Sequence, residues 1–534
     1  MLYLLVQMAK KKSSKEITRE DILKDLERAS KKFAKEHPKL GAMSRDYYRT
    51  HGNYNEAAIA SFFGNYTSAI SFARKNVGQI TRHDIHEIHE SEVDSGTHFV
   101  TAAIAGAPVG KKFIKPLETF LKAKKAKLNI LGMRGILKDD ETYDETIVQN
   151  YRHTMCAEYI YNTNLFAIDM KLYPQQFNPL TSMDRIGSKS TSLIVAHPKQ
   201  QMAVAPVGDN MNPHMLWSTG SITRPYYAQT RSGRFSSQEH VNGGLIVEVK
   251  NDKMFHVRQV QFNKDGTFSD LNKLYTPDGI ETIRALAATL GDIHAGWVDP
   301  TARKATFEQL EIMRPEQVFV GDVLDCSSIS HHSMNDRYAK HKLPKHLRTL
   351  ELELHTYAQE LELYCKAFPW IKLNLVYGNH EEHLLRYLKE GRYVDDIPEN
   401  HYLALELARY MLDDKNPVEE WCRTRYPHLF KNVKWLHIKE TIRIDGIMMS
   451  AHGHKGHSGS RGSAANMEKS YGKSNTGHSH SAQVLRDSRV AGCMCVFDMP
   501  YTEGSASKWS HSNIFNFKNQ AYQIYNSFGG DWKL

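Results

Sequence analysis

The sequence of 534 residues has few cysteines and no long apolar run. Its six cysteines are spread along the chain without a repeated CxxC pair, so neither a disulfide framework nor a structural zinc site is expected. No stretch approaches the ~20 consecutive apolar residues that a membrane-spanning helix needs. The first residues are apolar before they are basic, the reverse of a signal peptide. We therefore expect a reduced, cytoplasmic protein with no membrane partner.

The composition also lacks the bias of a disordered or fibrous protein. Hydrophobic residues make up 41% and charged residues 24% of the chain, with 18 prolines. At about 150 residues per domain, the length suggests about three domains. The net charge of +9, from 69 Lys and Arg against 60 Asp and Glu, favours an anionic partner without identifying it.

Residues 1–82 are predicted to form a basic helical module. Thr18 and Asp21 form a capping pattern at the start of a helix whose apolar residues recur at helical spacing. The segment 44–73 resembles one copy of the helix-turn-helix repeat that accompanies homing endonucleases, which implies DNA binding. The predicted DNA contacts, which lie among aromatic residues, are Arg45, Arg49, Arg74 and Lys75. The alternative is a basic helical interaction module unrelated to nucleic acid.

Residues 83–275 are predicted to form a mixed α/β domain of unknown role. Residues 99–105, 111–127 and 128–131 follow a strand, helix, strand pattern, and three further strands are expected at 192–196, 244–249 and 254–262. No motif in this part carries recognisable chemistry.

In residues 276–534, polar clusters follow short apolar segments that are typical of strands. The expected strands are 285–290, 315–320, 373–377 and 442–450. In open α/β architectures, ligands gather beyond the carboxyl ends of such strands. The clusters supply oxygen and imidazole donors without thiolate, which suit divalent metals. Their residues are Asp292, His294, Asp322, Asp325, Asn379, His380, His452, His478 and His480.

The order DxH, GDxxD, GNHE, H and GHxH resembles the calcineurin-like metallophosphoesterase family between Gly291 and His480. This resemblance implies an α/β fold, a two-sheet β-sandwich flanked by helices, with two divalent metal ions. It places Asp292, His294 and His480 on one metal, Asn379, His452 and His478 on the other, and Asp322 between them. By the same resemblance, His380 is the proton donor and the Asp325 carboxylate orients it.

The chemistry of phosphodiester cleavage explains why such a set of residues is needed. Two cations ~3.5–4 Å apart neutralise phosphate oxygens and lower the pKa of a bound water, and a positioned histidine protonates the departing oxygen. Carboxylate, amide and imidazole ligands favour Mn²⁺, and Mg²⁺, Fe²⁺ and Zn²⁺ remain open.

Two details favour a diester substrate. Cys326 stands where the protein Ser/Thr phosphatases have an arginine that holds the phosphoryl group, and the GHxH at 477–480 resembles the repair-exonuclease branch. We therefore interpret the chain as a metal-dependent DNA nuclease. The combination with the N-terminal repeat resembles early DNA-degrading proteins of large tailed phages, which act in the host cytoplasm. The alternatives are a protein or small-molecule phosphatase with the same metals and a non-enzymatic scaffold.

Two insertions separate the motifs. In the first, apolar residues at helical spacing between Leu347 and Tyr364 favour core packing over a dimer seam, and homo-oligomerisation stays open. The second, 452–477, is rich in glycine and is predicted to close over the DNA backbone, the alternative being a mobile solvated loop. Its basic residues are Lys455, Arg461, Lys469 and Lys473. His331 and His332 are candidates for substrate contact. His454 and His457 are candidates for extra ligands, although supporting or solvent roles are favoured for them.

Overall fold

The computed structural model describes residues 18–36, 43, 45–63, 69, 88–89, 93–136, 140, 142–186, 191–207, 214–331, 338–500, 502, 506–526 and 530–534. The fold is mixed α/β, as predicted. The helices are α2 (Arg19–Glu36), α3 (Arg45–His51), α4 (Glu56–Phe63), α6 (Lys111–Lys124), α7 (Glu145–Asn150), α8 (Arg231–Glu239), α9 (Pro300–Met313), α10 (Ala339–Lys342), α11 (Leu350–Ala367), α12 (Asn379–Lys389), α13 (Pro398–Leu412), α14 (Pro417–Arg425) and α15 (Ala464–Tyr471).

A six-stranded sheet forms the centre of the C-terminal part. In spatial order its strands are β18 (Val433–Trp435), β17 (Lys372–Val376), β16 (Gln317–Gly321), β15 (Ala287–Thr289), β24 (Ser512–Phe517) and β25 (Gln520–Tyr525). The first four are parallel, so their carboxyl ends lie at one edge. Three of the expected strands are confirmed as β15, β16 and β17.

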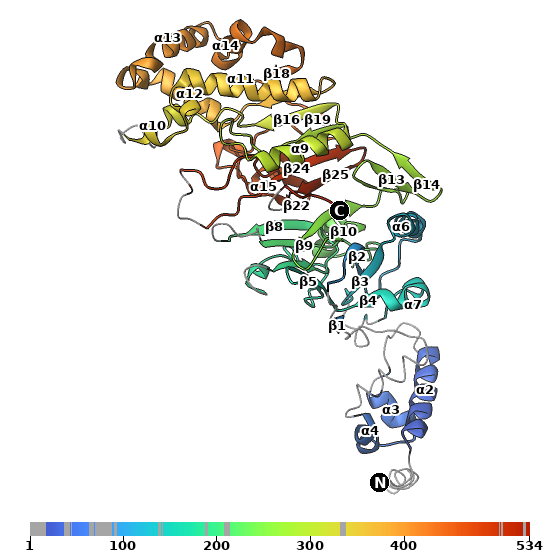
Figure 1. Ribbon diagram of the computed structural model, residues 1–534. Helices are drawn as coiled ribbons and strands as arrows, with labels where there is room; N and C mark the ends of the chain where they lie inside the picture. The colour runs from blue at the N-terminus through green and yellow to red at the C-terminus, as the bar shows by residue number, and fades with distance from the viewer. Residues whose placement is uncertain are drawn as a thin grey trace.

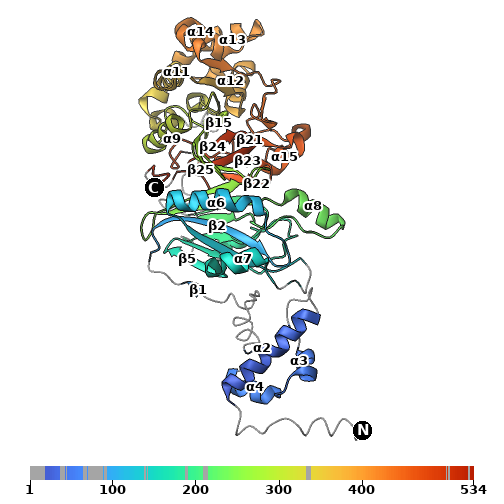
Figure 2. The same cartoon turned by 90° about the vertical axis from the view of Figure 1, so that its right-hand side faces the viewer.

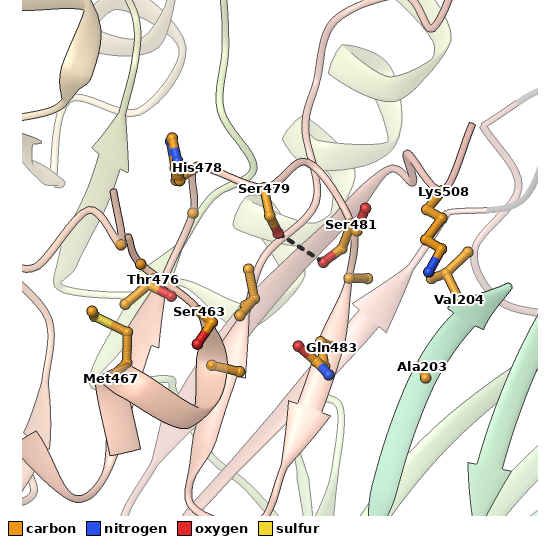
Figure 3. Close-up of a pocket in the computed structure, with 16 residues that line it drawn as sticks. Ala203, Val204, Ser463, Met467, Thr476, His478, Ser479, Ser481, Gln483 and Lys508 are labelled. Carbon is orange, nitrogen blue, oxygen red and sulfur yellow. Dashed lines mark hydrogen bonds between the residues drawn. The ribbon is translucent and has the colours of Figure 1, made fainter. Parts of the chain in front are cut away.

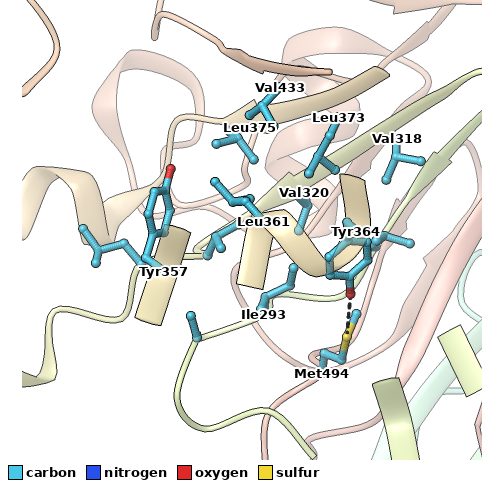
Figure 4. Close-up of a cluster of buried hydrophobic side chains, with 14 of the residues drawn as sticks. Ile293, Val318, Val320, Tyr357, Leu361, Tyr364, Leu373, Leu375, Val433 and Met494 are labelled. Atoms are coloured by element: carbon cyan, nitrogen blue, oxygen red, sulfur yellow. Dashed lines mark hydrogen bonds between the residues drawn. The ribbon is translucent and has the colours of Figure 1, made fainter. Parts of the chain in front are cut away.

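The two faces of this sheet pack differently because side chains alternate along a strand. Val318 and Val320 of β16 face a large core that includes α11, whereas Phe319 faces a smaller core with Ile447 and Met449. The apolar stripe of α11, with Leu347 just before it, is buried against the sheet, whereas Leu352 and Leu363 of the same helix are exposed. Tyr364 of the stripe donates a hydrogen bond to Met494 Sδ at 3.1 Å (Figure 4). The prediction that this stripe is core packing is confirmed.

A second, eleven-stranded sheet joins the middle and C-terminal parts. In spatial order it contains β1 (Ile88–His89), β5 (Glu158–Asn162), β6 (Leu165–Ile168), β7 (Ser192–Val195), β9 (His214–Ser218), β8 (Gln201–Ala205), β22 (Gln483–Leu485), β23 (Ser488–Val490), β21 (Ser474–Thr476), β20 (Ile447–Met448) and β19 (Arg443–Ile444). The junction is the antiparallel pair of β8 and β22, where Met202 lies opposite Val484. The division of the chain at 275/276 therefore separates two segments that share one sheet.

Two smaller sheets complete the middle part. One contains β11 (Phe255–Gln261), β10 (Gly243–Val249), β2 (Gly96–Ile104), β3 (Lys127–Met133) and β4 (Met155–Cys156), and the other β12 (Phe268–Asp270), β13 (Lys273–Thr276) and β14 (Gly279–Thr282). The predicted strand, helix, strand unit is confirmed as β2, α6 and β3, with the strands parallel. The buried Arg258 links both sheets through ion pairs with Glu248 of β10 and Asp270 of β12.

The N-terminal helices α2–α4 lie at one end of the molecule and α11–α14 at the other, with the sheets between them (Figures 1 and 2). The predicted cap is present, since Asp21 N donates to Thr18 Oγ1 at 3.2 Å and Thr18 N donates to Asp21 Oδ2 at 3.1 Å. Arg49 is exposed at the end of α3, and Arg45 begins that helix. Arg74 and Lys75 lie outside the described residues. Among the helices of the described ranges, none is long and apolar enough to span a bilayer.

Candidate metal centre

The predicted ligands lie in the loops that follow the strands of the two sheets. Asp292 follows β15, Asp322 follows β16, and Asn379 is the first residue of α12, just beyond β17. His452 and His478 follow β20 and β21 of the second sheet. The parallel arrangement of β15, β16 and β17 explains why residues far apart in sequence meet at this edge.

Asp292, His294 and His480 form the first buried group, with donor atoms within 4.8 Å of one another. The Nε2 atoms of the two histidines are 2.9 Å apart, and His480 Nε2 is 3.5 Å from Asp292 Oδ2. His294 Nδ1 is hydrogen-bonded to Asp325 Oδ1 at 2.6 Å. A carboxylate on the outer nitrogen of a histidine fixes the ring and directs its other nitrogen inward, as is usual for metal-binding histidines.

Asp322, His452 and His478 form the second group. His452 Nε2 is 2.9 Å from Asp322 Oδ2, and His478 Nδ1 is 2.9 Å from Asn379 Oδ1. The two groups are in contact, because His478 N donates to Asp292 Oδ2 at 2.6 Å. The structure thus brings all seven predicted ligands into one cluster.

Electrostatics show that this cluster is rich in buried negative charge. Burial raises the pKa of Asp292 to about 6, an effect that His452 opposes and Asp322 reinforces. Burial alone would also raise the pKa of Asp322, but His452 and His380 hold it well below its usual range. Burial would lower the pKa of His452, whereas Asp322 and Asp292 raise it to about 9. A buried carboxylate either takes up a proton or is compensated by a positive charge, and the raised pKa of His452 makes its imidazolium such a charge.

Several polar atoms of the cluster are left without a partner. Asp292 Oδ1, Asp322 Oδ1 and His480 Nδ1 are buried, and none has a hydrogen-bond partner within the described ranges. A buried polar atom without a partner costs free energy unless something else, such as an ion, satisfies it. The residues present therefore fit divalent metal ions.

The backbone of the ligands is also unusual. Four ligands, none of them glycine, have left-handed conformations, with φ of 50° at His294, 41° at Asp322, 74° at His478 and 56° at His480. Such conformations cost ~1–3 kcal/mol each and concentrate at functional sites. The strain supports a binding role for the cluster.

Glycine precedes several ligands because the backbone passes very close to the cluster. A Cβ at Gly378 would lie 2.1 Å from Asp322 Oδ1, and one at Gly477 would lie 2.3 Å from Asp292 Oδ1. Any side chain at these positions would displace a ligand. The glycines of the motifs are therefore required by packing against the ligands.

We expect Gly378→Ala to reduce metal binding sharply, because the added methyl group displaces Asp322. Metal content after loading with Mn²⁺ and gel filtration is the measurement. Gly391→Ala is the matched control, since nothing lies within 4 Å of its Cβ position, although its φ of 64° adds some strain. Equal metal content in both variants would contradict this account.

His380 lies beside both groups and, like Asn379 and His478, is only partly buried. Its Nε2 is 3.8 Å from Asp322 Oδ2, and 15% of its side chain is exposed, against 0–1% for those of His294 and His452. The predicted partner of His380 requires a correction. The Asp325 carboxylate bonds to His294, and it is the main-chain carbonyl of Asp325 that binds His380 Nδ1. The tight GDxxD turn thus presents the carboxylate of Asp325 to His294 and the main-chain carbonyl of Asp325 to His380.

The expected strand 442–450 is a short hairpin of β19 and β20, with Asp445-Gly446 as its turn. This dipeptide favours such hairpins.

The segment between His452 and Gly477 is more ordered than predicted. It contains α15, whose Ala464 and Met467 are buried. Its four predicted DNA contacts, Lys455, Arg461, Lys469 and Lys473, are all exposed. Lys455 bonds to Glu382, and Lys473 lies 3.8 Å from Asp487.

Other histidines surround the cluster. His383 lies between His380 and His331, with ring centroids 5.1 and 5.3 Å away, so His331 is one ring removed from His380. His332 lies outside the described residues. The His454 ring centroid is 5.5 Å from that of His452.

Two acidic groups that were not predicted also support the site. Glu381 Oε2 accepts a hydrogen bond from Gly378 N at 2.9 Å, and burial together with Asp322 raises its pKa to about 7. Glu353 of α11 accepts hydrogen bonds from Ser327 N and Ser328 N in the turn after Asp325. Glu381 belongs to the GNHE motif, but no local signal distinguishes Glu353 from other glutamates of its helix.

Comparison with known proteins finds a phage relative. The chain is similar to Protein A1 of Escherichia phage T5, with 32% identity over 322 residues, which are 57% of this chain and 57% of that protein. The chain therefore matches little more than half the length of this curated relative. No protein-family model matches the chain, and no solved structure matches it.

Proposed function

We propose that the protein is a metal-dependent phosphodiesterase that hydrolyses DNA at a dinuclear metal centre. One observation carries the proposal: seven candidate ligands and His380, which lie in five separate motifs between Asp292 and His480, converge in one buried cluster. The packing of two sheets around a common core, with helices on the outer face, supports a metallophosphoesterase-like fold.

The proposed roles follow from the two groups of donors. Asp292, His294 and His480 would hold one metal, and Asn379, His452 and His478 the other, with Asp322 between them. Bound metals would supply charge neutralisation of the phosphate and a water of lowered pKa. Mn²⁺ fits these oxygen and imidazole donors, as do Mg²⁺, Fe²⁺ and Zn²⁺.

The chain itself provides the proton. His380 is accessible, and the main-chain carbonyl of Asp325 holds its Nδ1, so its Nε2 faces the cluster. A histidine held in this way can donate a proton from Nε2 to the departing oxygen. Asp325 has a separate role, since its carboxylate keeps the His294 ring in place.

A diester of DNA is favoured over a phosphomonoester by two features. Cys326 is buried with its Sγ donating to the carbonyl of His380, so no arginine is available at that position to hold a phosphoryl group. The exposed basic residues of 452–477 lie next to two ligand-bearing segments and suit a polyanion. Similarity to a phage protein fits a role in the host cytoplasm during infection. A phosphatase with the same metals is the second candidate.

We expect His380→Asn to retain its metals but to cleave DNA ~10²–10⁴-fold more slowly, because a general acid is lost while the ligands stay. The measurement is the cleavage of linear and circular double-stranded DNA with Mn²⁺, Mg²⁺ or a chelator. His437→Asn, at an exposed position that belongs to neither ligand group, is the matched control. Cleavage of a phosphomonoester, with no cleavage of either DNA by metal-loaded wild-type protein, would contradict the proposal and favour the phosphatase.

A further inference from the structure

A cavity of about 280 Å³ lies beside the metal centre (Figure 3). His478 of the second ligand group lines one end of it. Ala203 and Val204 of β8 form part of the opposite wall, next to β22. Because β8 belongs to the middle part, a segment without any recognised motif contributes directly to the surroundings of the metal centre.

The lining of the cavity combines apolar and hydrogen-bonding groups. Val204 and Met467 supply apolar surface, while Ser463, Ser481 and Gln483 supply polar atoms. A nucleobase has two apolar faces and a hydrogen-bonding edge, and side-chain amides pair well with such edges. The volume is at the lower limit of small-molecule sites, which suits one nucleoside and is too small for a base pair.

The charge of the cavity favours a neutral or anionic occupant. Among the described residues that line it, Lys508 is the only one with a full charge, and no carboxylate is present. Lys508 is exposed and lies at the end of the cavity away from His478 (Figure 3). A nucleotide chain that passes from the metal centre into the cavity would therefore meet a cation at the far end.

We propose that this cavity binds the base and sugar adjoining the phosphate at the metal centre, and that Lys508 binds the next phosphate of the strand. The inference rests on the proposed function, because the metal centre fixes the position of the first phosphate. A base reaches the cavity only after it leaves the helical stack, which costs free energy in an intact duplex. Strand ends and single-stranded segments are therefore the favoured substrates.

Two variants test the cavity without altering a ligand. Ala203→Phe fills it from β8, at a half-buried strand position where an aromatic residue is compatible with the sheet. Lys508→Gln removes its cation, and Lys518→Gln, on the exposed turn between β24 and β25, is the matched control. The substrates are thymidine 5′-(4-nitrophenyl phosphate) and bis(4-nitrophenyl) phosphate, a diester that has no nucleoside. A pTpT 5′-(4-nitrophenyl ester) provides the next phosphate for Lys508.

With Ala203→Phe, we expect KM to rise about tenfold for the thymidine ester and to stay unchanged for the diester without a nucleoside. Lys508→Gln should raise KM only for the dinucleotide ester, and Lys518→Gln should change none of the three. Equal changes for all substrates, or no change with either cavity variant, would overturn the inference.

A binding measurement separates this inference from the proposed function. Calorimetry compares the affinities of Mn²⁺-loaded protein for dAMP and for inorganic phosphate. Tighter binding of dAMP measures the contribution of its base and sugar. If the wild type cleaves no diester, the proposed function fails, but a dAMP preference that Ala203→Phe abolishes still supports the cavity. A dAMP preference that is absent in the wild type or unchanged in Ala203→Phe overturns it.

Discussion

Asp322→Asn is expected to abolish tight metal binding and to slow DNA cleavage more than about a hundredfold. This loss is larger than the ~10–100-fold loss that is typical when a residue that only hydrogen-bonds to a metal ligand is replaced. Asp322 belongs to the second group, and its Oδ2 is 2.9 Å from His452 Nε2 and 3.8 Å from His380 Nε2. The amide keeps the shape of the side chain but removes the charge that would attract both cations. Metal content and thermal unfolding with and without Mn²⁺ are the measurements.

The unfolding measurement does not depend on activity. A metal that binds only the folded protein stabilises it by ~2.7 kcal/mol at a concentration one hundred times its Kd. Mn²⁺ should therefore raise the unfolding temperature of the wild type and of Asp278→Asn, an exposed control in the β13–β14 turn, but not that of Asp322→Asn. An equal rise in all three would show that Asp322 is not a ligand.

Arg258→Met is expected to lower the free energy of unfolding by ~3–5 kcal/mol, because it leaves two buried carboxylates without their cation. Arg258 Nη1 is 2.8 Å from Glu248 Oε2, and its Nε is 2.7 Å from Asp270 Oδ1. Leu534 N also donates to Glu248 Oε2 at 3.2 Å, so the group ties the C-terminal residue to two sheets. Urea unfolding followed by tryptophan fluorescence is the measurement.

The effect of Arg258→Met should depend on pH. Burial would raise the pKa of Glu248, but Arg258 lowers it from its ordinary 4.5 to about 2. A carboxyl with a lowered pKa stabilises the fold above its unfolded pKa, and this contribution is lost as the pH falls through the folded pKa. The difference between wild type and variant should therefore shrink as the pH falls from about 4.5 towards 2.

Two further variants complete this test. Arg284→Met removes an exposed arginine whose nearest carboxylate is 3.9 Å away, so its effect should stay below about 0.5 kcal/mol. Combining Arg258→Met with Glu248→Gln and Asp270→Asn should restore part of the stability, because the unpaired charges are gone. A loss below about 1 kcal/mol for Arg258→Met alone would contradict the account of a buried charge cluster.

Local patterns predicted many of the elements correctly. The cap formed by Thr18 and Asp21, the strand, helix, strand unit at 96–133 and the buried stripe of α11 all agree with the structure. These features depend on residues near one another in sequence. The hairpin of β19 and β20 was missed although its Asp-Gly turn was visible, because the apolar run around it was read as one strand.

The segment between His452 and Gly477 was not predicted correctly from local sequence. Its glycines indicate flexibility, yet Ser463 caps α15, with its side chain accepting from Asn466 N at 3.2 Å, and Met467 is buried. Contact with distant strands stabilises a helix that its short sequence would not maintain alone. DNA binding by this segment and by the N-terminal helices stays a prediction.

The candidate ligands can be recognised from local sequence, because the donor types and the glycines before them are local properties. Their convergence depends on the parallel strands β15, β16 and β17, which place the ends of distant segments at one edge. Two contacts follow from the folded chain alone: the Asp325 carboxylate bonds to His294, and β8 of the middle part lines a cavity beside His478. Such contacts join residues that are far apart in the chain, and no local pattern encodes their distance.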